Sequence, residues 1–419
     1  MSENGFVSPF VPAPLLQTAT AALFGMPGCV LVLVSTLMPV LTLATMTYLR
    51  TINPRLEEAA RLVSGSFGVL RTFTIPLIRP GIVLAATLVF LLALGDFSVP
   101  TYLRVEVFPA ESFTQFSAFY NFGAATAAAV PLVILTFSVL GVERLFLKQR
   151  SYELSPAPVG SKRPRLLLGR SRPFAVTVVA VLCLIIVVVP LIALLTQSGS
   201  AGAYIRAVHA VGDSLTHSLV LAVVGATALT ILGFLAGYLI HTRALAVWRV
   251  VDAGTVLLFA MPSTVIGIGL IAPWNRPATN LIYATPLMIL VGYLAQYTAL
   301  TSRATVAGLA QVPASMEEAA AVAGAGWVRR VGLIVVPLVW RTLMGGWLIA
   351  YIFCLRDTGI TMLVYPPGYD TLPVRIFTLM ANGAPDLIAA SSVLMILATI
   401  LPLAILTLVL RKYADSSWA

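Results

Sequence analysis

The sequence predicts an all-α, polytopic membrane protein with about nine transmembrane helices, each of roughly 20 residues. Composition is the first reason, because 59% of the 419 residues are hydrophobic and only 10% are charged. A water-soluble domain of this size needs more charge to keep its surface solvated. The second reason is that long stretches, among them 4–49, 173–205 and 387–410, contain no Asp, Glu, Lys or Arg.

The expected helices follow the apolar stretches, and short loops rich in basic residues separate them. We place the helices at about 28–49, 81–101, 124–145, 174–196, 214–241, 251–273, 282–302, 342–364 and 387–410. If the first helix ends in the cytoplasm at Arg50, 21 of the 26 Lys and Arg residues fall in loops on that side. Cytoplasmic loops carry such an excess, so the N-terminus is expected outside and the C-terminus in the cytoplasm.

The net charge of +10 does not indicate a nucleic-acid partner. The basic residues lie in short loops, and no basic soluble surface with interleaved aromatic residues is present to hold a polynucleotide. Cys29, Cys183 and Cys354 lie far apart in apolar stretches and are interpreted as small buried hydrophobes. The dispersed His209 and His241 are interpreted as structural, as is His217. The sequence therefore predicts no metal site and no catalytic residue.

A short charged motif occurs twice, each time in a basic segment between apolar stretches predicted to be cytoplasmic. The copies read Glu57-Glu58-Ala59-Ala60 and Glu317-Glu318-Ala319-Ala320. Glu and Ala favour helix, and a proline before each copy, Pro54 or Pro313, fits a helix start. Each copy is followed by a proline that ends the element, in Ile75-Pro76 and Val336-Pro337. The motif predicts a surface helix whose acidic pair docks a soluble partner. The alternative is an ordinary amphipathic interfacial helix.

The repeat divides the chain into two parallel halves, related by an axis along the membrane normal. The first half is expected at 1–147 with three helices and a docking loop at 54–80, and the second at 174–412 with six helices and a loop at 313–341. A basic, proline-containing cytoplasmic linker at 148–173 joins them, and 413–419 form a tail. The linker charge is interpreted as topology-setting, with anionic lipid contact as the alternative. Relative to the second half, the first is expected to lack three N-terminal helices.

The second copy resembles a known family signature. Glu318-Ala319-Ala320 is followed after three residues by Gly324, and after nine more by Ile334 and Val336-Pro337. This spacing resembles the cytoplasmic EAA signature of permease subunits of binding-protein-dependent ABC importers, with Val336 in place of the usual Leu. The first copy is one residue shorter and has Ser64 where Gly is expected, with Gly65 beside it. The resemblance implies the type I permease fold of these importers.

The resemblance also implies partners and cargo. No Gly-X-X-X-X-Gly-Lys-Ser/Thr sequence occurs, so the chain is expected to bind no cofactor and to rely on a separate ATPase dimer at the cytoplasmic face, which uses the ATP. A solute-binding protein is expected at the outer face, and the location is the bacterial inner membrane. Two fused halves are typical of the ferric-iron branch, which 95–100 and 365–375 also resemble. Thiamine, aminoethylphosphonate and polyamine are the alternative solutes.

Two functions of other kinds remain open. An ion-coupled secondary transporter would need a carboxylate or ion site near mid-bilayer, which the sequence does not reveal. An inactive, truncated permease would explain the three missing helices, although an upstream polypeptide could supply them. Three ionisable residues near predicted outer helix ends, Asp96, Arg356 and Asp357, are candidates for the pathway or its gate. We expect them to have a structural or gating role rather than to contact the solute.

Overall fold

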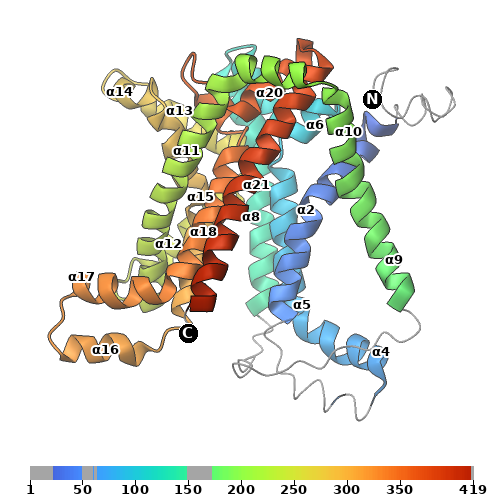
Figure 1. The fold of residues 1–419 in the computed structure, drawn as a ribbon. Helices are drawn as coiled ribbons and strands as arrows, with labels where there is room; N and C mark the ends of the chain where they lie inside the picture. Colours follow the sequence, from blue (N-terminus) through green and yellow to red (C-terminus); the bar gives the residue numbers. More distant parts are fainter. Residues whose placement is uncertain (1–21, 50–59, 61–63, 149–171, 417–419) are drawn as a thin grey trace. The chain divides into compact units, whose positions relative to one another are not determined.

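The computed structural model describes residues 22–49, 60, 64–148 and 172–416. All regular secondary structure in these residues is helical (Figure 1), which confirms the predicted fold class. The chain divides into two compact units. Unit 1 combines Met1–Glu111 with Ala127–Ala193, and unit 2 combines Ser112–Thr126 with Leu194–Ala419. The two repeat-based halves, whose boundaries differ from these, stay a prediction.

The number of membrane-spanning helices agrees with a polytopic protein. Seven helical stretches of the described residues are long and apolar enough to cross a membrane, and an eighth is added if the bent pair α12 (Trp248–Ala260) and α13 (Ser263–Trp274) counts as one span. The helix expected at 282–302 is α15 (Leu287–Leu309). α15 is less apolar than these stretches and is not counted among them. It can carry more polar residues because it packs against other helices of unit 2 on several sides, and many of its residues are buried.

Unit 1 contains long apolar helices joined by short ones. It holds α2 (Met26–Leu49), α4 (Ser66–Val69), the π-helical turn η1 (Leu70–Thr74), α5 (Ile75–Leu94), α6 (Ser98–Tyr102), α9 (Arg172–Cys183) and the π-helical turn η3 (Leu184–Val188). α2 packs against α5 where Gly81 faces Tyr48, and a Cβ on Gly81 would lie 2.2 Å from the tyrosine ring. α7 (Phe108–Ser117), α8 (Phe122–Lys148) and α10 (Val189–Ser198) belong partly to each unit.

Unit 2 is a bundle around α11 (Ala201–Thr242), α15, α18 (Val336–Arg356) and α21 (Pro385–Ser416). Figure 1 shows α14 (Asn280–Tyr283) and α20 (Leu372–Asn382) at one end of this bundle. At the opposite end, α16 (Ala314–Val322) and α17 (Trp327–Arg330) run across the bundle axis (Figure 1). The π-helical turn η4 (Val331–Val335) leads from α17 into α18, and α19 (Thr361–Val364) follows α18.

Two glycines bring α11 close to α15. A Cβ on Gly233 would lie 1.9 Å from Thr301 Oγ1 and 2.5 Å from Thr301 Cβ. A Cβ on Gly237 would lie 2.6 Å from the carbonyl oxygen of Ser302. Small residues four apart allow helix backbones to approach in this way. The Thr301 hydroxyl crosses the interface and donates a 2.7 Å hydrogen bond to the Leu229 carbonyl oxygen, so the contact combines close packing with a buried polar link.

Three expected helices are interrupted or displaced. α5 ends at Leu94 rather than 101, and the chain turns before α6. The span expected at 251–273 bends by 113° between α12 and α13. The helix expected at 342–364 starts at Val336 and ends at Arg356. A proline explains the second break, because Pro262 cannot continue a helical hydrogen-bond ladder. The other two breaks are followed by a carboxylate, Asp96 or Asp357, that accepts hydrogen bonds from the next turn.

We predict that Gly233→Ala destabilises the chain. The added methyl group must displace Thr301 or separate α11 from α15, and such overpacking costs about 1–3 kcal/mol. Thermal unfolding of the full chain in detergent should show a lower midpoint. Gly254→Ala is the matched control in α12, because nothing lies within 4 Å of its added Cβ. An unchanged midpoint for Gly233→Ala would show that the two helices are not closely packed at this position.

Candidate functional site: the acidic motif and the helix breaks

The first copy of the charged motif lies mostly outside the described residues. This holds for Glu57, Glu58 and Ala59, so their predicted docking role stays a prediction. Ala60 and Gly65 are described, and Gly65 is exposed. A Cβ added to Gly65 would meet nothing within 4 Å.

The second copy forms a short helix with defined ends. α16 starts directly after Pro313, as expected from the sequence, and contains Glu317, Glu318, Ala319 and Ala320. The amide of Ala325 donates to the Ala320 carbonyl oxygen, and that of Gly324 to the Ala321 carbonyl oxygen, both at 3.0 Å. Gly324 has φ +83°. These are the two bonds of a Schellman motif, in which the glycine supplies the bend between α16 and α17.

The two glutamates of this copy have different surroundings. Glu317 is partly buried, and its Oε1 accepts a hydrogen bond from the hydroxyl of Tyr238 on α11. Glu318 is exposed. Sequence reasoning missed Tyr238, because nothing in the local pattern links it to a motif 79 residues away. Of the two carboxylates, that of Glu317 is therefore bound within the chain, and that of Glu318 is exposed at the surface.

Exposed apolar side chains occur on α16 and α17. Val322 is 91% exposed and Val328 is 76% exposed, while Met316 and Trp327 are each 47% exposed. We call the exposed surface of α16 and α17, to which these four residues and Glu318 contribute, the α16–α17 face. On the element predicted to be cytoplasmic, such apolar side chains would be in water, and exposed apolar patches mark interaction sites. The face therefore combines one exposed acidic group with exposed apolar side chains.

A π-helical turn precedes the proline that follows each copy of the motif. The amide of Ile75, next to Pro76, donates to the Leu70 carbonyl oxygen. The amide of Val336, next to Pro337, donates to the Val331 carbonyl oxygen. Both bonds reach five residues back along the chain. The two motif segments thus enter their long helices, α5 and α18, through the same kind of turn.

The break after α18 is built around a buried carboxylate. Asp357 is 5% exposed, and its Oδ1 accepts a 2.8 Å hydrogen bond from the Tyr297 hydroxyl. Its Oδ2 accepts from both the amide (2.9 Å) and the hydroxyl (2.8 Å) of Thr361. The Thr361 hydroxyl also lies 3.1 Å from the Tyr293 hydroxyl. The carboxylate caps α19 and joins it to α15, a role that the sequence analysis did not foresee in this detail.

The neighbouring candidates differ from Asp357. Arg356 is exposed, and its guanidinium lies 5.6 Å from the centre of the Phe353 ring. In unit 1, the partly buried Asp96 accepts a 3.0 Å hydrogen bond at Oδ1 from the amide of Val99. Arg356 is thus exposed, whereas the adjacent Asp357 is buried. Asp96 and Asp357 each accept a hydrogen bond from a backbone amide of the turn that follows the helix break.

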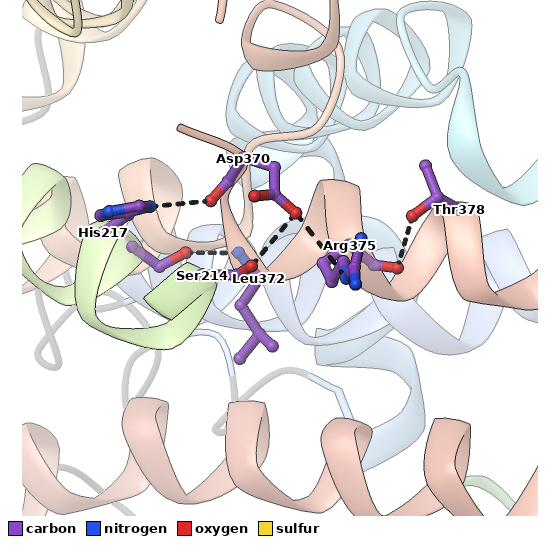
Figure 2. Close-up of polar contacts among 7 residues, drawn as sticks. Ser214, His217, Asp370, Leu372, Arg375 and Thr378 are labelled. Atoms are coloured by element: carbon purple, nitrogen blue, oxygen red, sulfur yellow. Dashed lines mark hydrogen bonds and ion pairs between the residues drawn. The ribbon is translucent and has the colours of Figure 1, made fainter. Parts of the chain in front are cut away.

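The segment 365–375 is attached to α11 by a polar cluster (Figure 2). Ser214 Oγ donates to Asp370 Oδ2 at 3.1 Å, and Arg375 Nε lies 3.9 Å from the same oxygen. The His217 ring stacks on Tyr369 with 3.7 Å between ring centres, and its Nδ1 lies 3.3 Å from the Asp370 carbonyl oxygen. These contacts agree with the structural role predicted for His217, which stays a prediction. This cluster fixes the loop at the end of unit 2 opposite α16.

In the described part of the chain, no three His, Cys, Asp or Glu side chains lie close enough together to hold a metal ion.

Comparison with known proteins identifies transport permeases as relatives. No family model matches the chain. A putative ferric transport system permease protein of Haemophilus influenzae is 21% identical over 404 residues, which cover 90% of this chain and 62% of the relative. A putative 2-aminoethylphosphonate transport system permease protein of Salmonella typhimurium is 28% identical over 142 residues, 34% of this chain and 53% of the relative. A spermidine/putrescine transport system permease protein of Haemophilus influenzae is 26% identical over 196 residues, 47% of this chain and 75% of the relative.

The chain thus spans about three fifths of the ferric relative and half of the aminoethylphosphonate relative. The match to the ferric permease nevertheless runs along most of this chain. The resemblance to importer permeases that the repeated motif predicts is therefore confirmed.

Proposed function

We propose that this chain is the membrane-spanning permease subunit of an ATP-driven importer and that the α16–α17 face docks its ATPase. The observation that carries the proposal is the exposed combination of Glu318 with Val322 and Val328 at one end of unit 2. A carboxylate pairs with a basic partner through charge-assisted hydrogen bonds, and the two valines supply apolar area to bury. The ATPase dimer, which uses the ATP, and the solute-binding protein are separate subunits of the proposed system.

The proposed mechanism is alternating access. Closure of the ATPase dimer would move α16 and α17, and η4 would pass this motion to α18. Asp357 lies at the far end of α18, where it joins α19 to α15. Its burial favours a role in gating over contact with the solute. We give Asp96 the equivalent role in unit 1, whereas Arg356 is exposed and remains a candidate for the pathway.

The proposed solute is ferric iron, because the match that covers 90% of this chain is to a putative ferric transport system permease. Proteins named for 2-aminoethylphosphonate and for spermidine and putrescine match shorter parts of the chain. The proposal keeps the inner membrane as location, with the N-terminus outside and the C-terminus in the cytoplasm. A permease of this kind is a transport subunit rather than an enzyme.

We predict that Glu318→Lys strongly reduces ATP-dependent uptake by the complete transport system. The substitution replaces an attractive charge at the docking face with a repulsive one, and a hydrogen bond to a charged group contributes about 1.5–3 kcal/mol. Uptake and ATPase co-purification should both fall by about tenfold or more. Glu106→Lys is the control, because it makes the same charge change at an exposed site predicted to lie outside. Wild-type uptake and co-purification in Glu318→Lys would refute docking through this face.

A second prediction concerns the solute. Cells that express the complete system should accumulate ⁵⁵Fe³⁺, and deletion of this chain should abolish that accumulation. Excess unlabelled Fe³⁺ should compete with it, whereas excess 2-aminoethylphosphonate, spermidine or thiamine should not. The iron assignment is wrong if deletion leaves ⁵⁵Fe³⁺ uptake intact but abolishes uptake of one of the other labelled solutes.

A further inference from the structure

One hydrogen bond links the docking helix to the longest helix of unit 2. Tyr238 lies near the C-terminal end of α11, which ends at Thr242, and its hydroxyl donates to Oε1 of Glu317 on α16. A hydrogen bond to an ionised carboxylate is stronger than one between neutral groups. This bond connects two elements that are far apart in the sequence.

The tyrosine ring is itself held in place by aromatic neighbours. Its centre lies 6.0 Å from the Phe234 ring, which is inclined to it by 30°, and 6.0 Å from the Trp327 ring of α17, which meets it edge to face. Tyr238 also packs against an apolar cluster that contains Phe234, Leu309, Val331, Val335 and Val339. This cluster joins α11 to α15, η4 and α18. The hydroxyl that binds Glu317 is therefore carried by a fixed ring.

We infer that Tyr238 is a positioning residue that holds α16 on α11 through Glu317 and leaves Glu318 as the carboxylate that meets a partner. Anchoring of α16 depends only on contacts within the chain. Its use in transport rests on the proposed function, because the partner of Glu318 is the proposed ATPase. The two glutamates of the motif then have separate tasks: Glu317 transmits force to α11, and Glu318 binds.

The residues of α11 that precede Tyr238 pack closely against α15, so a movement of Tyr238 can reach that helix. Gly237, the preceding residue, lies against the Ser302 carbonyl oxygen of α15, and Gly233 lies against Thr301. A displacement of α16 that pulls on Tyr238 would therefore act where α11 and α15 are in closest contact. Closely packed interfaces switch between discrete arrangements rather than deforming continuously, so a small shift can be amplified there.

Hydrogen exchange of the purified full chain, without any ATPase, tests the anchor directly. Tyr238→Phe keeps the ring and removes the hydroxyl, and Glu317→Ala removes the acceptor. Each should increase the exchange rates of the α16 amides by about fivefold or more, because local opening becomes easier when an anchoring bond is lost. The double variant should show no larger increase than the more affected single variant, because both changes remove the same bond.

Two matched controls separate this role from general destabilisation. Glu318→Ala makes the same substitution at the next position of α16 and should leave exchange of α16 unchanged. Tyr204→Phe removes a hydroxyl from the same helix α11 at its other end, where it lies 2.8 Å from Ser198 Oγ, and should also leave α16 unchanged. Unchanged α16 exchange in Tyr238→Phe, or multiplying effects in the double variant, would overturn the inference.

Failure of the anchor and failure of the proposed function are distinguishable. If the exchange pattern is found but Glu318→Lys leaves ⁵⁵Fe³⁺ uptake and ATPase co-purification unchanged, the anchor stands and docking is wrong. If Glu318→Lys abolishes uptake while Tyr238→Phe leaves α16 exchange unchanged, docking stands and the anchor is wrong.

Discussion

Backbone hydrogen bonding inside the bilayer is the constraint on which the rest of this structure depends. Lipid offers no partner to a free amide or carbonyl, so a helix can break at membrane depth only where protein supplies one. Both breaks in unit 2 meet this condition with help from α15. Gln296 Nε2 donates to the Met261 carbonyl oxygen at the bend between α12 and α13. Tyr297 donates to Asp357, the carboxylate that caps α19.

The composition of α15 follows from that task. A helix that satisfies two breaks must carry hydroxyl and amide groups, and these are tolerated because neighbouring helices cover them. Close approach of those helices requires glycine, which occurs at Gly233 and Gly237 where α11 meets α15. At the breaks themselves, Gly359 lies against Ser263, and an added Cβ would fall 1.9 Å from the serine hydroxyl. In unit 2, polar side chains thus satisfy the helix breaks, and glycines allow the close helix packing that covers those polar side chains.

The sequence predicted the fold class and most helices, because spans of apolar residues are long and charges mark their ends. It could not predict the break at Asp357, which lies within the helix expected at 342–364. The carboxylate there is held both by the nearby Thr361 and by Tyr297, which lies 60 residues earlier in the sequence. The proposed docking pair shows the same limit. Glu317 and Glu318 carry the same side chain and are adjacent in the sequence. The hydrogen bond that distinguishes Glu317 comes from Tyr238, 79 residues earlier. Local patterns therefore locate the proposed docking element but not the different surroundings of its two glutamates.

The π-helical turns show how far the two copies of the motif are equivalent. Proline lacks an amide and its ring clashes with the carbonyl four residues back, so a helix must adjust before it. One added residue in the turn achieves this, before Pro76 in the first copy and before Pro337 in the second. The same turn occurs at η3 before Pro190, where no motif copy is present. The turn is therefore not specific to the motif. It also does not accompany every proline, because α2, α8 and α21 contain Pro39, Pro131 and Pro402 without a π-helical turn. What the two copies share at the entry to their long helices is thus the hydrogen bond from Ile75 or Val336 to the carbonyl five residues back, and the following proline alone does not produce it.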